Sequence, residues 1–181
     1  MKRNKTLDFL SLLFCSCFVS VVAQNPHVHG DVNLNIVKDN SQLEIDLISP
    51  SVNIIGFEHA ASSNEERMVL EKANNLLVQH ELIFSFQDEP CKHSETVVVQ
   101  SGPTEKNKVE PDHHDHHHAH KKDPHSDFEV QYRYECSEEL YSLLVNLADY
   151  FSGVSQINVR WIKDGLQGGA TLNAAEREII F

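Results

Sequence analysis

Histidine is the residue type that most distinguishes this chain, and its placement points to metal chemistry. Of 12 histidines in 181 residues, seven fall between positions 113 and 125. Neutral imidazole is a good ligand for Zn(II), Cu(II), Ni(II) and Co(II), and the nearby Asp112 and Asp115 would help to neutralise a cation. We therefore expect this segment to bind metal ions. Its candidate ligands are His113, His114, His116, His117, His118, His120 and His125.

So dense a run offers many overlapping sets of four ligands, which favours several labile sites over one rigid cage. The spacing does not distinguish zinc from nickel, cobalt or copper. The competing interpretation is a solvated, low-complexity loop that binds metal only incidentally.

A second candidate group lies elsewhere in the chain. His27 and His29 are two positions apart, so in a strand both rings would point to one face, with Cα atoms about 7 Å apart. They could hold one ion if other residues completed the site. His59 follows an apolar stretch and could contribute, with Glu58 or the histidine-rich segment supplying the rest. The alternative is an exposed pair without a binding role. Of the remaining histidines, we expect His80 to be structural and His93 to be an optional extra ligand.

The N-terminal residues predict export. Three basic residues precede an apolar run at residues 9–19, and Val-Val-Ala at 21–23 suits a signal peptidase. The run is short for a transmembrane span, and no second apolar segment follows. We therefore interpret residues 1–23 as a cleavable signal peptide and Gln24 as the mature start. The alternative is a lipoprotein acylated on Cys17, whose preceding residues fit that pattern poorly.

Charge and cysteine content narrow the function further. A formal net charge of −12 argues against a nucleic-acid-binding protein. Removing residues 1–23 leaves two of the four cysteines, Cys91 and Cys136. In an exported chain we expect them to form a disulfide rather than a thiolate metal site. If they face each other, strands 92–100 and 127–135 pair antiparallel. Residues 101–126, here called the arm, would then be a mobile, polar excursion near the hairpin tip.

The first half of the mature chain predicts a hairpin followed by a helix. Apolar and polar residues alternate at 32–36 and 43–47 around a turn at 39–40. The apolar stretch 54–57 is a strand or a buried loop. Ser63 and Glu66 form a capping box for an amphipathic helix over 64–80.

The second half repeats this arrangement loosely. Strands are predicted at 96–99 and 128–136, then a helix over 138–151 that is capped by Ser137 and ended by Gly153. Strands at 157–161 and 170–172 follow, with turns at 164–165 and 168–169. The order β-β-α-β-β-α-β-β predicts an α+β fold in a single domain, residues 24–181. Two helices would lie on one face of an antiparallel or mixed sheet.

The mature chain resembles the ZrgA-type family of periplasmic zinc-binding proteins along nearly its whole length. The resemblance includes Cys91 and the His/Asp-rich arm, and it rests on six segments. They are HVHG at 27–30, LNI at 34–36, SPSVNIIGFEH at 49–59, FEVQYRYEC at 128–136, INVRW at 157–161 and QGGATL at 167–172.

This resemblance implies a periplasmic protein made when zinc is scarce, working beside an ABC-type zinc importer. It also implies that His27, His29 and His59 match the family's metal-related histidines. It lends nothing to a catalytic role.

The leading hypothesis is therefore a binding protein that scavenges Zn(II) with its arm and passes the ion to a structured site or a partner. A multi-site metal buffer or metallochaperone without an importer is the alternative. A zinc hydrolase would need a fixed three-ligand site and a base such as Glu58, and no sequence signature supports one, so we do not expect an enzyme. An interaction protein that uses the arm as a pH-switched clamp is a further option.

Overall fold

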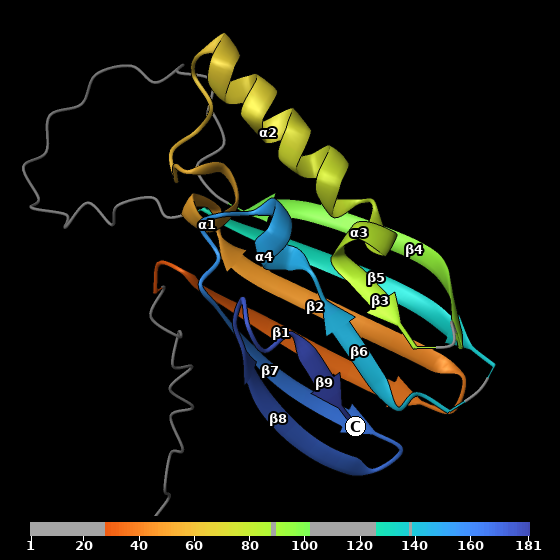
Figure 1. Ribbon diagram of the computed structural model, residues 1–181. Helices are drawn as coiled ribbons and strands as arrows, with labels where there is room; N and C mark the ends of the chain where they lie inside the picture. Colours follow the sequence, from red (N-terminus) through yellow and green to blue (C-terminus); the bar gives the residue numbers. More distant parts are fainter. Residues whose placement is uncertain (1–27, 88–89, 102–125, 138) are drawn as a thin grey trace, which may run out of the picture.

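The structure is a computed structural model that describes residues 28–87, 90–101, 126–137 and 139–181 (Figure 1). The predicted signal peptide, His27 and the seven arm histidines lie outside the described residues. In the described part, no helix is long and apolar enough to cross a membrane.

A six-stranded sheet forms the body of the domain, with the strand order β4-β5-β2-β1-β7-β8. Its strands are β1 (Asp31–Asp39), β2 (Gln42–Pro50), β4 (Cys91–Ser101), β5 (Asp127–Cys136), β7 (Gln156–Lys163) and β8 (Leu166–Leu172). The pair β1–β7 is parallel, and the other neighbours are antiparallel. The expectation of a mixed sheet is therefore confirmed.

A smaller sheet and four helical segments accompany this large sheet (Figure 1). The small sheet has the order β3-β6-β9 and comprises β3 (Phe84–Phe86), β6 (Ser142–Val145) and β9 (Glu178–Ile180). The helices are α1 (Ser51–Ile55), α2 (Asn64–Leu77), α3 (His80–Ile83) and α4 (Leu147–Tyr150).

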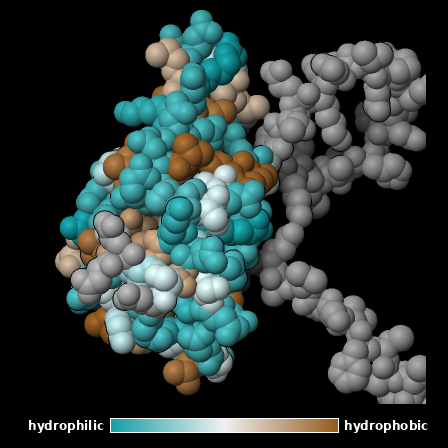
Figure 2. Space-filling view, turned by 90° about the vertical axis from the view of Figure 1, so that its right-hand side faces the viewer, coloured by the Kyte–Doolittle hydropathy of each residue, from teal (hydrophilic) through white to brown (hydrophobic). Residues whose placement is uncertain are grey.

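The alternating sequence of the central strands explains the core. In β5, Phe128, Val130, Tyr132 and Tyr134 are buried, while Glu129, Arg133 and Glu135 are exposed. The same two-residue period buries Leu34 and Ile36 of β1 and Ile45 and Leu47 of β2. The buried apolar side chains thus face the small sheet and the helices. The opposite face of the large sheet carries most of the polar side chains together with the exposed Val37, Ile48, Val97, Val99 and Ile162. The side of the molecule seen in Figure 2 is largely hydrophilic, with its apolar residues in small groups.

The predicted helix 64–80 is confirmed in position, although α2 ends at Leu77 and His80 starts the separate turn α3. Its capping box is present as predicted, with Ser63 and Glu66 bonding reciprocally. Only Ala73 and Leu77 of α2 are buried, and the Tyr132 hydroxyl donates a 2.8 Å hydrogen bond to the Leu77 carbonyl. The C-terminal part of α2 is therefore anchored to the core, while its first turns project from the body (Figure 1).

The predicted pairing of the two cysteine-bearing strands is also confirmed. Cys91 and Cys136 are register partners in β4 and β5 and form a disulfide. The pairing shifts by one residue between His93 and Glu95, a β-bulge that the sequence did not indicate. From there β4 runs to Ser101, which pairs with Asp127, so the arm begins and ends at the far end of these strands from the disulfide.

The predicted second helix over 138–151 is wrong. This stretch contains strand β6 and the single turn α4. Its leucines do fit a helical stripe, but Leu143 and Val145 fit a strand equally well, and both are buried. Because β6 lies between β3 and β9 and pairs with both, long-range pairing overrides the local helical pattern.

Two further expectations need correction. Gly168 and Gly169 lie inside β8 rather than in a turn. Position 168 requires glycine because a Cβ there would lie 2.3 Å from the ring of Trp161, which packs against it. The element order is β-β-α-α-α-β-β-β-β-α-β-β-β rather than β-β-α-β-β-α-β-β. The domain is thus richer in strand than the predicted α+β fold with two helices on one face.

Candidate metal site

The candidate ligands within the described residues gather around the loop that joins α1 to α2. Gly56, in the left-handed conformation with φ of 84°, caps α1 and turns the chain outward. The next residues, Phe57, Glu58 and His59, precede the capping box that starts α2. The loop between α1 and α2 therefore carries one carboxylate, that of Glu58, and one imidazole, that of His59.

His29 approaches this loop from the start of β1. Its Nε2 lies 3.4 Å from Oε1 of Glu58; the His29 side chain is 67% exposed and that of Glu58 is 19% exposed. The chain beside His29 is held in place because Gly30 donates a 2.7 Å hydrogen bond to Oδ1 of the buried Asn53 in α1. Asn53 Nδ2 donates in turn to the Asp31 carbonyl, at 2.9 Å. The amide of Asn53 thus fixes the N-terminal segment against α1.

The C-terminal end of the arm meets the same loop. Buried Ser126 donates from its Oγ to the backbone carbonyl of Glu58 at 2.8 Å. The amide of Ser51, the first residue of α1, donates to the Ser126 carbonyl, also at 2.8 Å. Ser126, which immediately follows His125, is therefore hydrogen-bonded to Glu58, the residue before His59.

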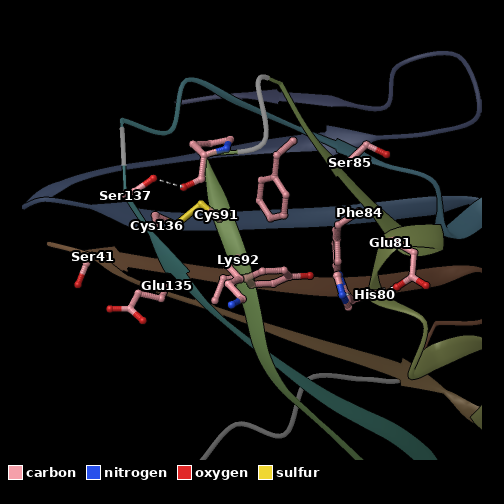
Figure 3. A pocket seen from close by; sticks show the side chains of 13 residues that line it. Ser41, His80, Glu81, Phe84, Ser85, Cys91, Lys92, Glu135, Cys136 and Ser137 are labelled. Carbon is pink, nitrogen blue, oxygen red and sulfur yellow. Dashed lines mark hydrogen bonds and ion pairs between the residues drawn. A yellow bond between two sulfur atoms is a disulfide. The ribbon is translucent and has the colours of Figure 1, made fainter.

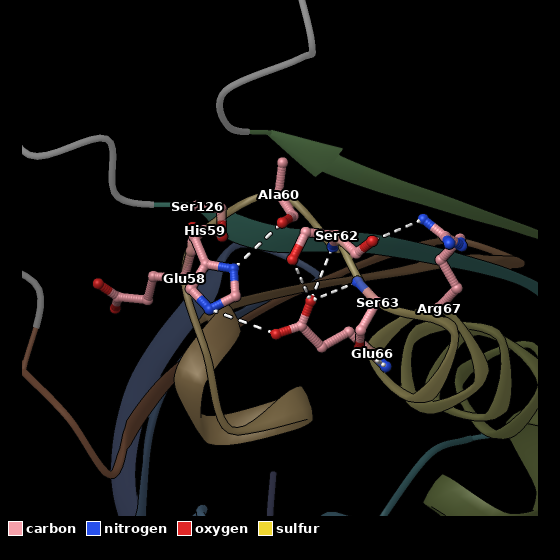
Figure 4. Close-up of polar contacts among 8 residues, drawn as sticks. All are labelled: Glu58, His59, Ala60, Ser62, Ser63, Glu66, Arg67 and Ser126. Atoms are coloured by element: carbon pink, nitrogen blue, oxygen red, sulfur yellow. Dashed lines mark hydrogen bonds and ion pairs between the residues drawn. The ribbon is translucent and has the colours of Figure 1, made fainter.

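His59 is oriented by two contacts (Figure 4). Its Nδ1 lies 3.1 Å from the Ala60 carbonyl oxygen, which accepts a hydrogen bond in the tautomer that carries the proton on Nδ1. Its ring stacks on Phe57 with centroids 4.9 Å apart and an interplanar angle of 19°. With the ring held in this way, Nε2 faces Oε1 of Glu66 at 3.6 Å.

Glu66 is held by the cap of α2. Its Oε2 accepts hydrogen bonds from Ser62 N at 2.7 Å, Ser62 Oγ at 3.0 Å and Ser63 N at 3.0 Å. The bonds from the Ser63 and Ser62 amides, in that order, together with the Ser62 hydroxyl, lower the pKa of Glu66 from 4.5 to about 2. The carboxylate is therefore charged at any physiological pH, with Oε1 turned toward His59.

The described ligand candidates thus form two imidazole–carboxylate pairs, His29 with Glu58 and His59 with Glu66. In the ranges that the structure describes, no three His, Cys, Asp or Glu side chains are grouped closely enough to enclose an ion. The predicted convergence of His27 with His29 and His59 involves a residue outside those ranges and stays a prediction. Glu66 was missed as a site residue because the sequence explains it fully as a cap.

The two remaining described histidines lie at the other end of the domain. His80 of α3 and His93 of β4 stack with ring centroids 3.9 Å apart, and Tyr134 packs edge-on against both. His93 Nε2 is 2.8 Å from Thr96 Oγ1. Burial and the neighbouring His93 lower the pKa of His80, and Glu81 opposes them. His80 thus packs against His93 and Tyr134 at the start of α3 rather than at the C-terminus of α2, and its structural role stays a prediction.

A pocket of about 980 Å³ opens beside this stack and the disulfide (Figure 3). His80, Phe84, Lys92 and Glu135 are among its lining residues. It is separate from the loop that carries His59.

The chain is similar to one known protein family over most of its length. A family model described as ZrgA family zinc uptake protein matches residues 26–181. No curated protein matches the chain.

Proposed function

Because the chain belongs to the ZrgA family of zinc uptake proteins, we propose that it is a periplasmic protein that scavenges Zn(II) for uptake. The arm captures ions through His113, His114, His116, His117, His118, His120 and His125. The structured region around His27, His29 and His59 then receives them. An ABC-type importer is the proposed destination of the zinc, and residues 1–23 are the proposed export signal.

One observation carries this proposal: the arm ends at the loop that holds the structured ligand candidates. The Ser126–Glu58 hydrogen bond places the end of the arm next to His59, and Glu58 is itself paired with His29. Because His125 directly precedes Ser126 in the sequence, an ion that His125 binds would need to travel only a short distance to reach these side chains.

The chemistry of the pairs suits a labile ion. One imidazole and one carboxylate are both good zinc ligands, and a pair leaves other coordination positions for the arm or water. The side chains of His29 and His59 are 67% and 60% exposed, so further ligands can reach an ion bound to either of them. Such a site exchanges its ion more readily than a closed four-ligand site, and a protein that passes zinc onward requires this property.

A multi-site metal buffer is the second candidate. Seven histidines within 13 positions can hold several ions without any structured acceptor. The two functions differ in stoichiometry and affinity: several weak sites indicate buffering, and one or more tighter structured sites indicate delivery.

Zinc-limited growth tests the uptake function. In a strain that lacks the gene, the wild-type chain should restore growth and cellular zinc under chelation. A chain without residues 112–125, and one with H29A and H59A together, should restore them only in part. A chain with H80Q and H93Q is the matched control, because it removes two histidines at the other end of the domain. Equal rescue by all four chains would contradict the proposal.

A further inference from the structure

We propose that Glu66 is a zinc ligand and that it forms, with His59, a binding position separate from the His29–Glu58 pair. The inference rests on the proposed function, because it assigns a further ligand to the same zinc-binding region. It goes beyond the sequence, which accounts for Glu66 only as the reciprocal partner of Ser63 at the start of α2.

The spacing of His59 Nε2 and Glu66 Oε1 fits a zinc ion bound by both atoms. Zinc binds imidazole nitrogen at about 2.0–2.1 Å and carboxylate oxygen at about 2.0–2.2 Å, so tetrahedral ligands lie about 3.4 Å apart. His59 Nε2 and Glu66 Oε1 lie 3.6 Å apart. A shift of a few tenths of an ångström brings the two atoms to the spacing of two zinc ligands.

The hydrogen bonds around the pair leave these two atoms facing each other. In the neutral tautomer whose Nδ1 donates to the Ala60 carbonyl, the lone pair of the His59 ring lies on Nε2. Oε2 of Glu66 is occupied by its bonds to Ser62 and Ser63, and Oε1 faces the ring. A lone pair that faces a carboxylate oxygen is repulsive unless a proton or a cation lies between them. A zinc ion bound by both atoms would remove this repulsion.

Both ligands are held before the ion arrives. Phe57 stacks on the His59 ring, and Arg67 donates from Nη1 to the Ser62 carbonyl and from Nη2 to Oδ1 of Asn64. Arg67 therefore fixes the turn whose amides hold Glu66. Groups that orient a metal ligand in this way commonly change metal affinity when they are removed.

The Glu58 carboxylate belongs to a different position. In Figure 4 the Glu58 side chain points away from His59, whereas Glu66 approaches His59 from the opposite side. Glu58 Oε1 is within 3.4 Å of His29 instead. Loss of Glu66 should therefore weaken zinc binding at His59 and leave binding at His29 unchanged.

Side-chain ¹⁵N NMR of histidine tests this residue by residue. Zinc chloride is titrated at pH 7 into the full mature chain, residues 24–181, and the shift of each imidazole nitrogen is followed. E66Q is the test variant, since its amide oxygen can still accept from the Ser62 and Ser63 amides. E65Q removes the same charge one residue away and leaves the Glu66 carboxylate and its cap in place.

In the wild type, His59 Nε2 should shift with zinc. In E66Q the zinc concentration at the midpoint of that shift should rise roughly tenfold or more, since a ligand is lost. In E65Q that midpoint should stay within about twofold of the wild-type value, and the His29 midpoint should not change in either variant. An E66Q midpoint equal to that of the wild type, in a chain whose circular dichroism spectrum is unchanged, would overturn the inference.

Other outcomes separate the inference from the proposed function. If zinc shifts other histidines but leaves His59 unmoved, the Glu66–His59 position does not exist and the zinc-binding function stands. If zinc shifts no histidine in the wild type, the proposed function itself fails, and the inference fails with it.

Discussion

Ser126 and Glu58 are 68 positions apart, yet the Ser126 hydroxyl donates a 2.8 Å hydrogen bond to the Glu58 carbonyl. This bond attaches the last residue of the arm to the loop between α1 and α2. It joins the start of β5 to the loop that carries His59, and Ser126 is almost fully buried there. The contact gives the arm a fixed end beside the candidate ligands.

Replacing this hydroxyl should lower the stability of the domain. S126A removes this hydrogen bond, and the loss of a buried hydrogen bond costs about 1 kcal/mol. S101A is the matched control, because the Ser101 hydroxyl is exposed and its bond to the Asp127 carbonyl is long, at 3.5 Å. Urea unfolding measures both variants. Equal free energies of unfolding for S126A, S101A and the wild type would show that the contact contributes nothing.

Removing the disulfide should destabilise the domain more strongly. The bond closes a loop with a sequence separation of 45 residues. On the chain-entropy relation, such a closure contributes about 4 kcal/mol. The double variant C91S/C136S should therefore unfold at lower urea, while zinc binding at His59 persists because the disulfide lies at the other end of β4 and β5. A loss below about 1 kcal/mol would contradict the expected contribution.

The His80–His93 stack should make stability depend on pH. Because the pKa of His80 is lowered by burial and by His93, the folded chain binds a proton at His80 less readily than the unfolded chain does. His80 should therefore not lower the free energy of unfolding above pH 6.5, the ordinary pKa of histidine in the unfolded chain. As the pH drops below 6.5, the free energy of unfolding should fall. H80Q removes this proton-binding group, so its free energy of unfolding should fall less between pH 7.5 and 5. An unchanged slope would assign the pH dependence to other groups.

Zinc affinity should also fall with pH, for a different reason. Imidazole must be deprotonated to bind zinc, and histidine ordinarily titrates near pH 6.5. Calorimetric titrations between pH 5 and 7.5 should therefore show weaker binding at each lower pH, whichever histidines bind. Constant affinity over this range would exclude imidazole as the main ligand.

Antiparallel geometry made part of the fold predictable. Facing Cys91 with Cys136 fixes the register of the strands on either side of the arm, and this pairing is present up to the bulge. The capping box of Ser63 and Glu66 was equally accessible, because it depends only on residues three positions apart.

The elements that failed depend on distant partners. Residues 138–151 carry a leucine spacing that suits a helix, and only the pairing of β6 with β3 and β9 selects the strand. Gly168 was interpreted as a turn residue because the Trp161 ring that packs on it comes from another strand.

The candidate site shows the same division. His29 and His59 were predicted as metal ligands from their spacing and surroundings, and that role remains a prediction. Their partners were only partly accessible, because the contact between His59 and Glu66 requires residues 60–62 to fold back against the first turn of α2. No sequence period describes that loop.

Zinc titration by calorimetry with native mass spectrometry tests the central claim most directly. It compares the mature chain, a chain without residues 112–125, and a chain with H27A, H29A and H59A. H80Q/H93Q is the control. The account predicts that the arm deletion lowers the number of bound ions but leaves zinc binding in the structured region that depends on His27, His29 and His59. Loss of all zinc binding when residues 112–125 are removed would show that the arm alone is the site, and would contradict the account.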